Sequence, residues 1–309
     1  MNLRTAVHLG GAAVAAAVLI ALATSSNTRH SPAHRAQYVQ VRSLTLRYVR
    51  AGRGTPVVLI HGYGESMMAW RAVFDLLAAH HDVLALDLPG FGLSSKPAEG
   101  YETDSIARDV LRALQTIGIG PAVLVGHSLG GAVAFAATLQ GPGRIRALAL
   151  VDPALVGTPA PVSEMKQSDR DGGSASSAIA EYEALRTRFT APHDPQWLAE
   201  SDSALAYVPA DDPAYRVAVA AVLREFDFAY LTDQRAAALT LPTLVLWGEY
   251  DEVFPVESGR RLAARLTNAR FLVIPRSWHR PHVERPAETA DAVLRFVAAL
   301  DSARNRGSH

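Results

Sequence analysis

Six short runs of apolar, mostly β-branched residues recur along the chain, and segments with helical spacing separate them. The runs occupy residues 56–60, 82–87, 122–126, 147–152, 243–248 and 270–275. Nearly continuous apolar runs of this length are typical of strands that are buried on both faces of a parallel sheet. The segments 105–118 and 255–267 between them carry apolar residues on one helical face. The alternation predicts an α/β fold with a doubly wound, mostly parallel sheet, preceded by a hairpin at 38–49.

The alternation is interrupted once, between residues 157 and 236, where no strand pattern occurs. The segments 176–189 and 212–231 have helical spacing there, and the second begins with the start signal Asp212-Pro213. We therefore expect a helical cap inserted into a sheet domain. The predicted division is a leader with a linker (1–36), the first part of the core (37–156), the cap (157–236), the second part of the core (237–303) and a C-terminal tail (304–309).

The composition excludes several classes of function. Lys plus Arg and Asp plus Glu number 30 each, so no excess of charge favours a nucleic-acid partner. Because 49% of the residues are apolar, the chain can bury a large core and is not a disordered protein. It has no cysteine, which excludes disulfides, thiolate nucleophiles and cysteine-ligated zinc. The pair His80-His81 has no further ligand at metal-binding spacing, so we expect neither a metal site nor a cofactor.

The first residues form a separate segment. Arg4 precedes an apolar run from Leu9 to Ala23, and Ala21-Leu22-Ala23 has the small-x-small form of a processing site. This pattern predicts a secretory signal peptide and export to the periplasm or the medium. An uncleaved anchor is the alternative, with membrane contact through this segment, although the run is slightly shorter than the roughly 20 residues that span a bilayer.

Three glycines surround one serine directly after the third apolar run. Gly126, Gly130 and Gly131 flank Ser128, although each glycine weakens a strand or helix by roughly 0.5–1 kcal/mol. The cluster predicts a sharp turn from strand to helix that presents the serine hydroxyl. In open α/β sheets ligands bind at the carboxyl ends of the strands. Asp251 and His279 each follow a later strand, so a serine, an acid and a histidine are expected at one edge of the sheet.

These segments resemble the α/β-hydrolase fold superfamily. The sequence GHSLG at 126–130 matches its G-x-S-x-G nucleophile elbow, and the chain order serine, acid, histidine is that of the superfamily. The segments HGYG, DLPGFGLS, LWGEYDEVFP and WHRPHVERP are similar to its other signatures, in the expected order, and the resemblance extends over residues 38–303. The inserted cap is similar to the one that many members carry after the sixth strand.

The resemblance implies a catalytic triad. Ser128 is the expected nucleophile, His279 the base that takes its proton, and Asp251 the acid that holds the imidazole in one tautomer. The backbone N–H of Leu129 begins the helix after the serine and points at the developing oxyanion. By resemblance the backbone N–H of Tyr63 is the second donor of the oxyanion hole.

Two of these assignments have rivals in the sequence. His282 follows His279 by three residues, and Trp278 replaces the glycine that usually precedes the catalytic histidine. His61 and His127 are expected to be structural. The rivals of the acid are Glu249, Glu252 and Asp152, the last because some relatives carry the acid after the sixth strand.

The predicted activity is hydrolysis of a carboxylic ester with an apolar acyl group, through an acyl-enzyme. Haloalkane dehalogenases and epoxide hydrolases of this fold carry an aspartate where Ser128 stands, so the resemblance excludes them. Carbon–carbon bond hydrolases and cofactor-free haloperoxidases keep the serine and stay as alternatives, although HGYGES at 61–66 lacks the G-x-G-P-G form common in the former. A non-catalytic ligand-binding member is the alternative from another class of function.

Overall fold

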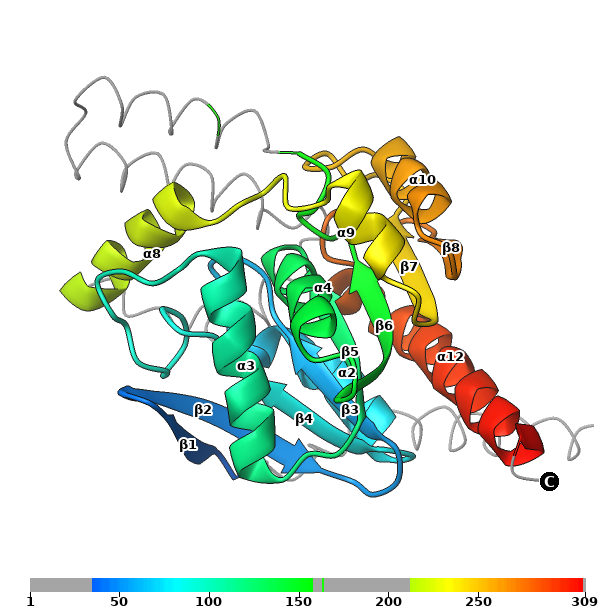
Figure 1. Cartoon of the computed structure of the whole chain (residues 1–309), viewed down its shortest axis with the longest axis horizontal. Helices are drawn as coiled ribbons and strands as arrows, with labels where there is room; N and C mark the ends of the chain where they lie inside the picture. Colours follow the sequence, from blue (N-terminus) through cyan, green and yellow to red (C-terminus); the bar gives the residue numbers. More distant parts are fainter. Residues whose placement is uncertain (1–34, 158–162, 164–211, 308–309) are drawn as a thin grey trace, which may run out of the picture. The chain divides into compact units, whose positions relative to one another are not determined.

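The computed structural model describes residues 35–157, 163 and 212–307, and within them eight strands form one sheet (Figure 1). Its order is β1-β2-β4-β3-β5-β6-β7-β8. The strands are β1 (Gln37–Val41), β2 (Leu44–Ala51), β3 (Pro56–Ile60), β4 (Asp82–Leu86), β5 (Ala122–His127), β6 (Ile145–Val151), β7 (Thr243–Gly248) and β8 (Ala269–Ile274). β2 pairs antiparallel with β1 and β4, and the pairings from β4 to β8 are parallel. The predicted α/β class and mostly parallel sheet are confirmed.

Helices cover both faces of this sheet. The helices in residues 35–157 and 212–307 are η1 (Met67–Trp70), α2 (Arg71–Ala78), α3 (Thr103–Ile117), α4 (Leu129–Gln140), α8 (Pro213–Glu225), α9 (Asp233–Ala238), α10 (Val256–Arg265), α11 (Pro281–Glu284) and α12 (Pro286–Gly307). Because side chains alternate along a strand, Val57 and Leu59 of β3 join a core with η1, α2 and α12, whereas Val58 and Ile60 join a core with α3 and α4. The sheet is therefore buried on both sides, as its apolar runs require.

The helix predicted from Asp212 begins where expected but ends early. The Asp212 side chain accepts a hydrogen bond from the N–H of Ala214, and Pro213 occupies the first turn of α8. The helical spacing extends to residue 231, yet α8 stops at Glu225. The backbone N–H of Asp227, which would continue the helix, instead donates to Thr103 Oγ1 at 3.2 Å. This long-range bond competes with the local pattern.

The termini and the cap are described only in part. The leader and linker prediction at 1–36 lies outside the described residues except for its last two positions, and most of the cap, including the segment 176–189, lies outside them as well. Across residues 35–157 and 212–307 no helix is long and apolar enough to cross a membrane. Residues 304–307, expected in a tail, belong to α12, whose last turn carries Arg304 and Arg306 at the negative end of the helix dipole.

Candidate active site

Ser128 lies at the sharp turn between β5 and α4, as the glycine cluster predicts. Its backbone has φ 48° and ψ −118°, a strained conformation for a residue with a side chain. A Cβ added at Gly126 would lie 2.3 Å from the carbonyl oxygen of Gly130, and one added at Gly130 would lie 2.3 Å from that of His61. The strand, the helix and the loop after β3 approach so closely that only glycine fits. These close contacts hold the serine hydroxyl at the carboxyl edge of the sheet.

The structure brings Ser128, His279 and Asp251 together. His279, in the loop after β8, has its Nε2 3.0 Å from Ser128 Oγ and its Nδ1 2.9 Å from Asp251 Oδ2. Asp251 Oδ1 accepts hydrogen bonds from the N–H groups of Val253 and Phe254, at 2.8 and 3.0 Å. Burial acts to raise the pKa of Asp251, but His279 and the N–H of Phe254 outweigh it, so its pKa lies below the usual value. An ionised Asp251 therefore keeps the imidazole proton on Nδ1 and leaves Nε2 as an acceptor for the hydroxyl proton.

The rival acids are placed differently. Asp152 is fully buried, and its Oδ1 accepts a hydrogen bond of 2.8 Å from the N–H of Gly248. Burial, and then the charge of Asp251, raise the pKa of Asp152 well above its usual value. A neutral carboxyl beside Asp251 supports that residue and does not replace it. The two other candidates, Glu249 and Glu252, are exposed.

The two expected oxyanion donors lie on neighbouring segments. Leu129 is the first residue of α4, so its backbone N–H has no acceptor within the helix and lies at the positive end of the helix dipole. Tyr63 follows β3, which pairs with β5 as far as Ile60 and Gly126, so its loop runs beside the serine turn. The Tyr63 hydroxyl donates to the carbonyl of Val219 in α8, at 3.3 Å, which links this loop to a helix of the predicted cap.

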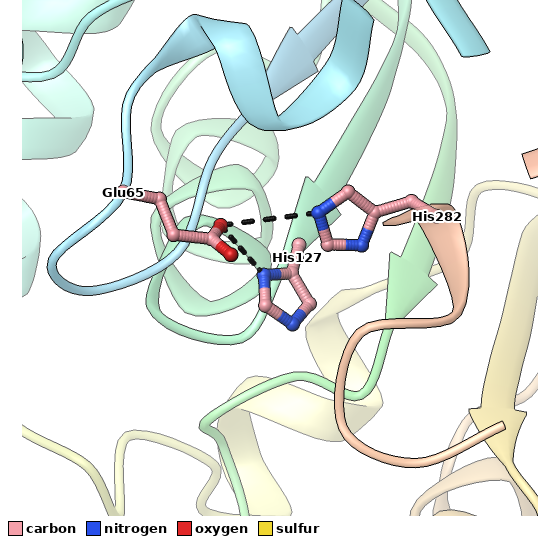
Figure 2. Close-up of side chains that lie close together, drawn as sticks. All are labelled: Glu65, His127 and His282. Atoms are coloured by element: carbon pink, nitrogen blue, oxygen red, sulfur yellow. Dashed lines mark hydrogen bonds and ion pairs between the residues drawn. The ribbon is translucent and has the colours of Figure 1, made fainter. Parts of the chain in front are cut away.

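His279, and not His282, is the histidine that faces Ser128. His282 lies in a buried group of polar side chains that the sequence did not reveal. We call this group the Glu65 cluster: Glu65, His127, Arg280 and His282. Figure 2 shows the Glu65 carboxylate facing the rings of His127 and His282. Glu65 and Arg280 lie in the segments HGYGES and WHRPHVERP, but nothing in those segments indicates that the two side chains are buried against each other.

Two groups of side chains among the described residues have the spacing of metal ligands. Their potential ligand atoms lie within 4.8 Å of one another in each case: Glu65, His127 and His282 in one, and Asp152, Asp251 and His279 in the other. In the first group Arg280 Nε already lies 2.8 Å from Glu65 Oε1 and balances the carboxylate. In the second group the His279 imidazole is hydrogen-bonded to both Ser128 and Asp251. Contacts within the protein therefore account for both groups without a metal ion.

Comparison with known proteins identifies the protein family. The family model of the alpha/beta hydrolase fold matches residues 55–286, and the chain belongs to this family. It is 31% identical over 262 residues to 2-hydroxymuconate semialdehyde hydrolase of Pseudomonas sp. (strain CF600), covering 82% of this chain and 90% of that protein. It is 29% identical over 283 residues to 2-hydroxy-6-oxo-6-(2'-aminophenyl)hexa-2,4-dienoic acid hydrolase of Metapseudomonas resinovorans, covering 85% and 90%. A crystal structure described as a membrane phospholipase A, a bacterial virulence factor, is similar with a TM-score of 0.67 and 28% identity, covering 94% of this chain and 96% of that chain.

Proposed function

We propose that this chain is a serine hydrolase that cleaves carboxylic esters through an acyl-enzyme. The observation that carries the proposal is the continuous hydrogen-bonded line from Ser128 Oγ through His279 to Asp251, with distances of 3.0 and 2.9 Å. A serine hydroxyl is a weak nucleophile, and a base held at hydrogen-bond distance is what activates it. A ligand-binding member without catalysis has no need of this arrangement.

The proposed reaction uses each group in turn. Ser128 Oγ attacks the ester carbonyl while its proton passes to His279 Nε2, and the N–H groups of Tyr63 and Leu129 bind the oxyanion. One such donor is worth about 2.7–4 kcal/mol of transition-state stabilisation. The tetrahedral intermediate collapses, the alcohol leaves with the proton from His279, and the acyl group stays on the serine. Water then enters, gives its proton to His279, and releases the acid by the same steps in reverse order.

Hydrolysis of a carbon–carbon bond is the second candidate. Two relatives that match over four-fifths or more of this chain are named as hydrolases of a semialdehyde and of a dienoic acid, and the related phospholipase favours esters instead. The fold alone does not choose between these bonds. The site supports the ester proposal, because His279 alone can protonate the alcohol that leaves from an ester.

A substrate panel tests the choice. p-Nitrophenyl esters of increasing acyl length are compared with a 2-hydroxy-6-oxo-dienoate, using Ser128→Ala as the control for both. We expect ester turnover that Ser128→Ala abolishes, with a preference for one acyl length. Serine-dependent cleavage of the dienoate with a much larger kcat/KM than for every ester would contradict the ester proposal and select the second candidate.

A further inference from the structure

The Glu65 cluster joins three segments of the active site. Glu65 belongs to the loop that carries Tyr63, His127 directly precedes Ser128, and Arg280 directly follows His279. All four members of the cluster are buried, and none is more than 7% exposed. The family match and the roles proposed above leave these side chains without a function.

His127 has hydrogen-bond acceptors on both sides of its ring. Its Nδ1 lies 3.0 Å from Glu65 Oε2, and its Nε2 lies 2.7 Å from the backbone carbonyl oxygen of His279. A carbonyl oxygen only accepts, so Nε2 carries a proton. A neutral imidazole has one N–H and an imidazolium has two. Both contacts are therefore hydrogen bonds only if the ring is an imidazolium or if Glu65 is protonated.

The surroundings of Glu65 select the first of these. Glu65 Oε2 also accepts a hydrogen bond of 2.8 Å from the N–H of Gly62, and Arg280 Nε lies 2.8 Å from Oε1. Burial acts to raise the pKa of Glu65, but His127 and Arg280 outweigh it and hold the pKa well below its usual range. Because the Arg280 guanidinium and the Gly62 N–H both face it, Glu65 is a carboxylate that only accepts. With an acceptor at each ring nitrogen, both contacts of His127 are hydrogen bonds only if the ring carries two N–H groups.

The two neighbouring histidines, His282 and His61, are neutral. Burial, and then the charge of His127, lower the pKa of His282 well below its usual value. Its ring packs against those of His127 and Trp70, with both centroid distances 4.3 Å. Burial likewise lowers the pKa of His61, whose Nε2 accepts a hydrogen bond from a backbone N–H. The cluster thus holds one anion and two cations, and a divalent cation there would add further uncompensated charge in a buried site.

We propose that the Glu65–His127 ion pair is a positioning device for the catalytic groups. His127 donates from Nε2 to the backbone carbonyl of His279, and so fixes the ring that takes the serine proton. Glu65 holds the N–H of Gly62, and so fixes the loop that presents the Tyr63 N–H. A Cβ at Gly62 would lie 2.6 Å from His127 Nδ1 and 3.1 Å from Glu65 Oε2, so the pair packs directly on that loop. This inference rests on the proposed function, because it acts through His279 and Tyr63.

NMR can measure the charge state of His127 directly. Long-range ¹H–¹⁵N correlation spectra of ¹⁵N-labelled wild-type protein at pH 7.5 report whether each ring carries one or two N–H groups, and His127→Gln assigns the signal. We expect imidazolium shifts for both ring nitrogens of His127. A neutral ring would overturn the proposal. The charge state is measured on the wild-type protein, and the variant serves only to assign the signal.

Kinetics tests the positioning role. Glu65→Gln removes the charge and keeps the shape, and the exposed Glu257→Gln serves as the matched control. Because a small misplacement of reacting groups can cost up to about 100-fold, we expect Glu65→Gln to lower kcat by about 10- to 100-fold, with KM for a short-chain aryl ester nearly unchanged. The rate of labelling by a fluorophosphonate should fall by a similar factor. Glu65→Asp, which restores the charge, should recover part of the loss.

The outcomes separate this inference from the proposed function. A Glu65→Gln variant that is less stable but keeps the wild-type kcat and labelling rate would show a structural role only and overturn the inference. A wild-type protein that is folded but is neither labelled nor active on esters would refute the proposed function, whatever the charge of His127.

Discussion

Exchanging the two buried aspartates for asparagine, one at a time, tests which carboxylate serves the histidine. In Asp251→Asn the amide keeps an oxygen for the N–H groups of Val253 and Phe254, but an NH₂ group can face His279 Nδ1 in place of Oδ2. The imidazole then holds its proton on Nε2 and cannot accept one from Ser128. In a serine protease the same change costs about 10⁴-fold in kcat. At about 1.36 kcal/mol for each factor of ten, this equals roughly 5.5 kcal/mol of transition-state stabilisation.

Asp152→Asn should be far milder. Burial already keeps Asp152 neutral, so the exchange removes no charge. The amide oxygen accepts the N–H of Gly248, and the NH₂ group takes the place of the OH of the neutral carboxyl. We expect a loss of kcat/KM of about 10-fold or less, which is about 1.4 kcal/mol. Asp152→Ala differs, because it leaves the buried N–H of Gly248 without its acceptor and should lower the free energy of unfolding by about 1–3 kcal/mol.

The assay is kcat/KM on one short-chain aryl ester for both asparagine variants, with circular dichroism and thermal unfolding to establish that each is folded. If Asp152→Asn is folded and loses more activity than Asp251→Asn, the acid follows the sixth strand and the account of the site is wrong.

The remaining predictions concern stability, the serine turn and the leader. Because burial holds the pKa of His282 well below its usual value, the unfolded chain binds a proton below about pH 6.5 that the folded chain does not. The free energy of unfolding should therefore fall as the pH drops below that value. In urea titrations His282→Phe should lessen the slope of this free energy against pH by up to about 1.4 kcal/mol per pH unit. Equal slopes for the variant and the wild-type protein would contradict the neutral state assigned to His282. Gly126→Ala places a Cβ 2.3 Å from a backbone oxygen and should cost about 1–3 kcal/mol or more, whereas Gly120→Ala, with nothing within 4 Å, should cost little; similar losses would count against the close approach. Mass spectrometry of protein from the native host should find a mature terminus near Thr24, and an intact Met1 terminus in the membrane fraction would favour an anchor.

The strands were predictable from sequence because each is a short apolar run between segments of different periodicity. The runs at 56–60 and 243–248 coincide with β3 and β7, and burial on both faces explains why the signal is strong. The position of Ser128 was also predictable, since glycines are required where strand and helix nearly touch. In both cases the information is local.

What the sequence could not predict depends on contacts between distant segments. At the end of α8 the backbone N–H of Asp227 donates to Thr103 Oγ1, 124 residues away along the chain, and not to its own helix. Glu65 and His127 are 62 residues apart, and His127 and the carbonyl of His279 are 152 apart. A glutamate in a loop has no periodicity that marks it as buried, so its role emerges only when the fold brings a histidine and an arginine against it.

The central claim is that Ser128 forms a covalent intermediate, and intact-mass measurement after fluorophosphonate treatment tests it most directly. We predict a single adduct per chain on the wild-type protein and none on Ser128→Ala, with the folded state of the variant verified by circular dichroism. Stoichiometric labelling of Ser128→Ala, or a folded wild-type protein that takes up no label, would contradict the account.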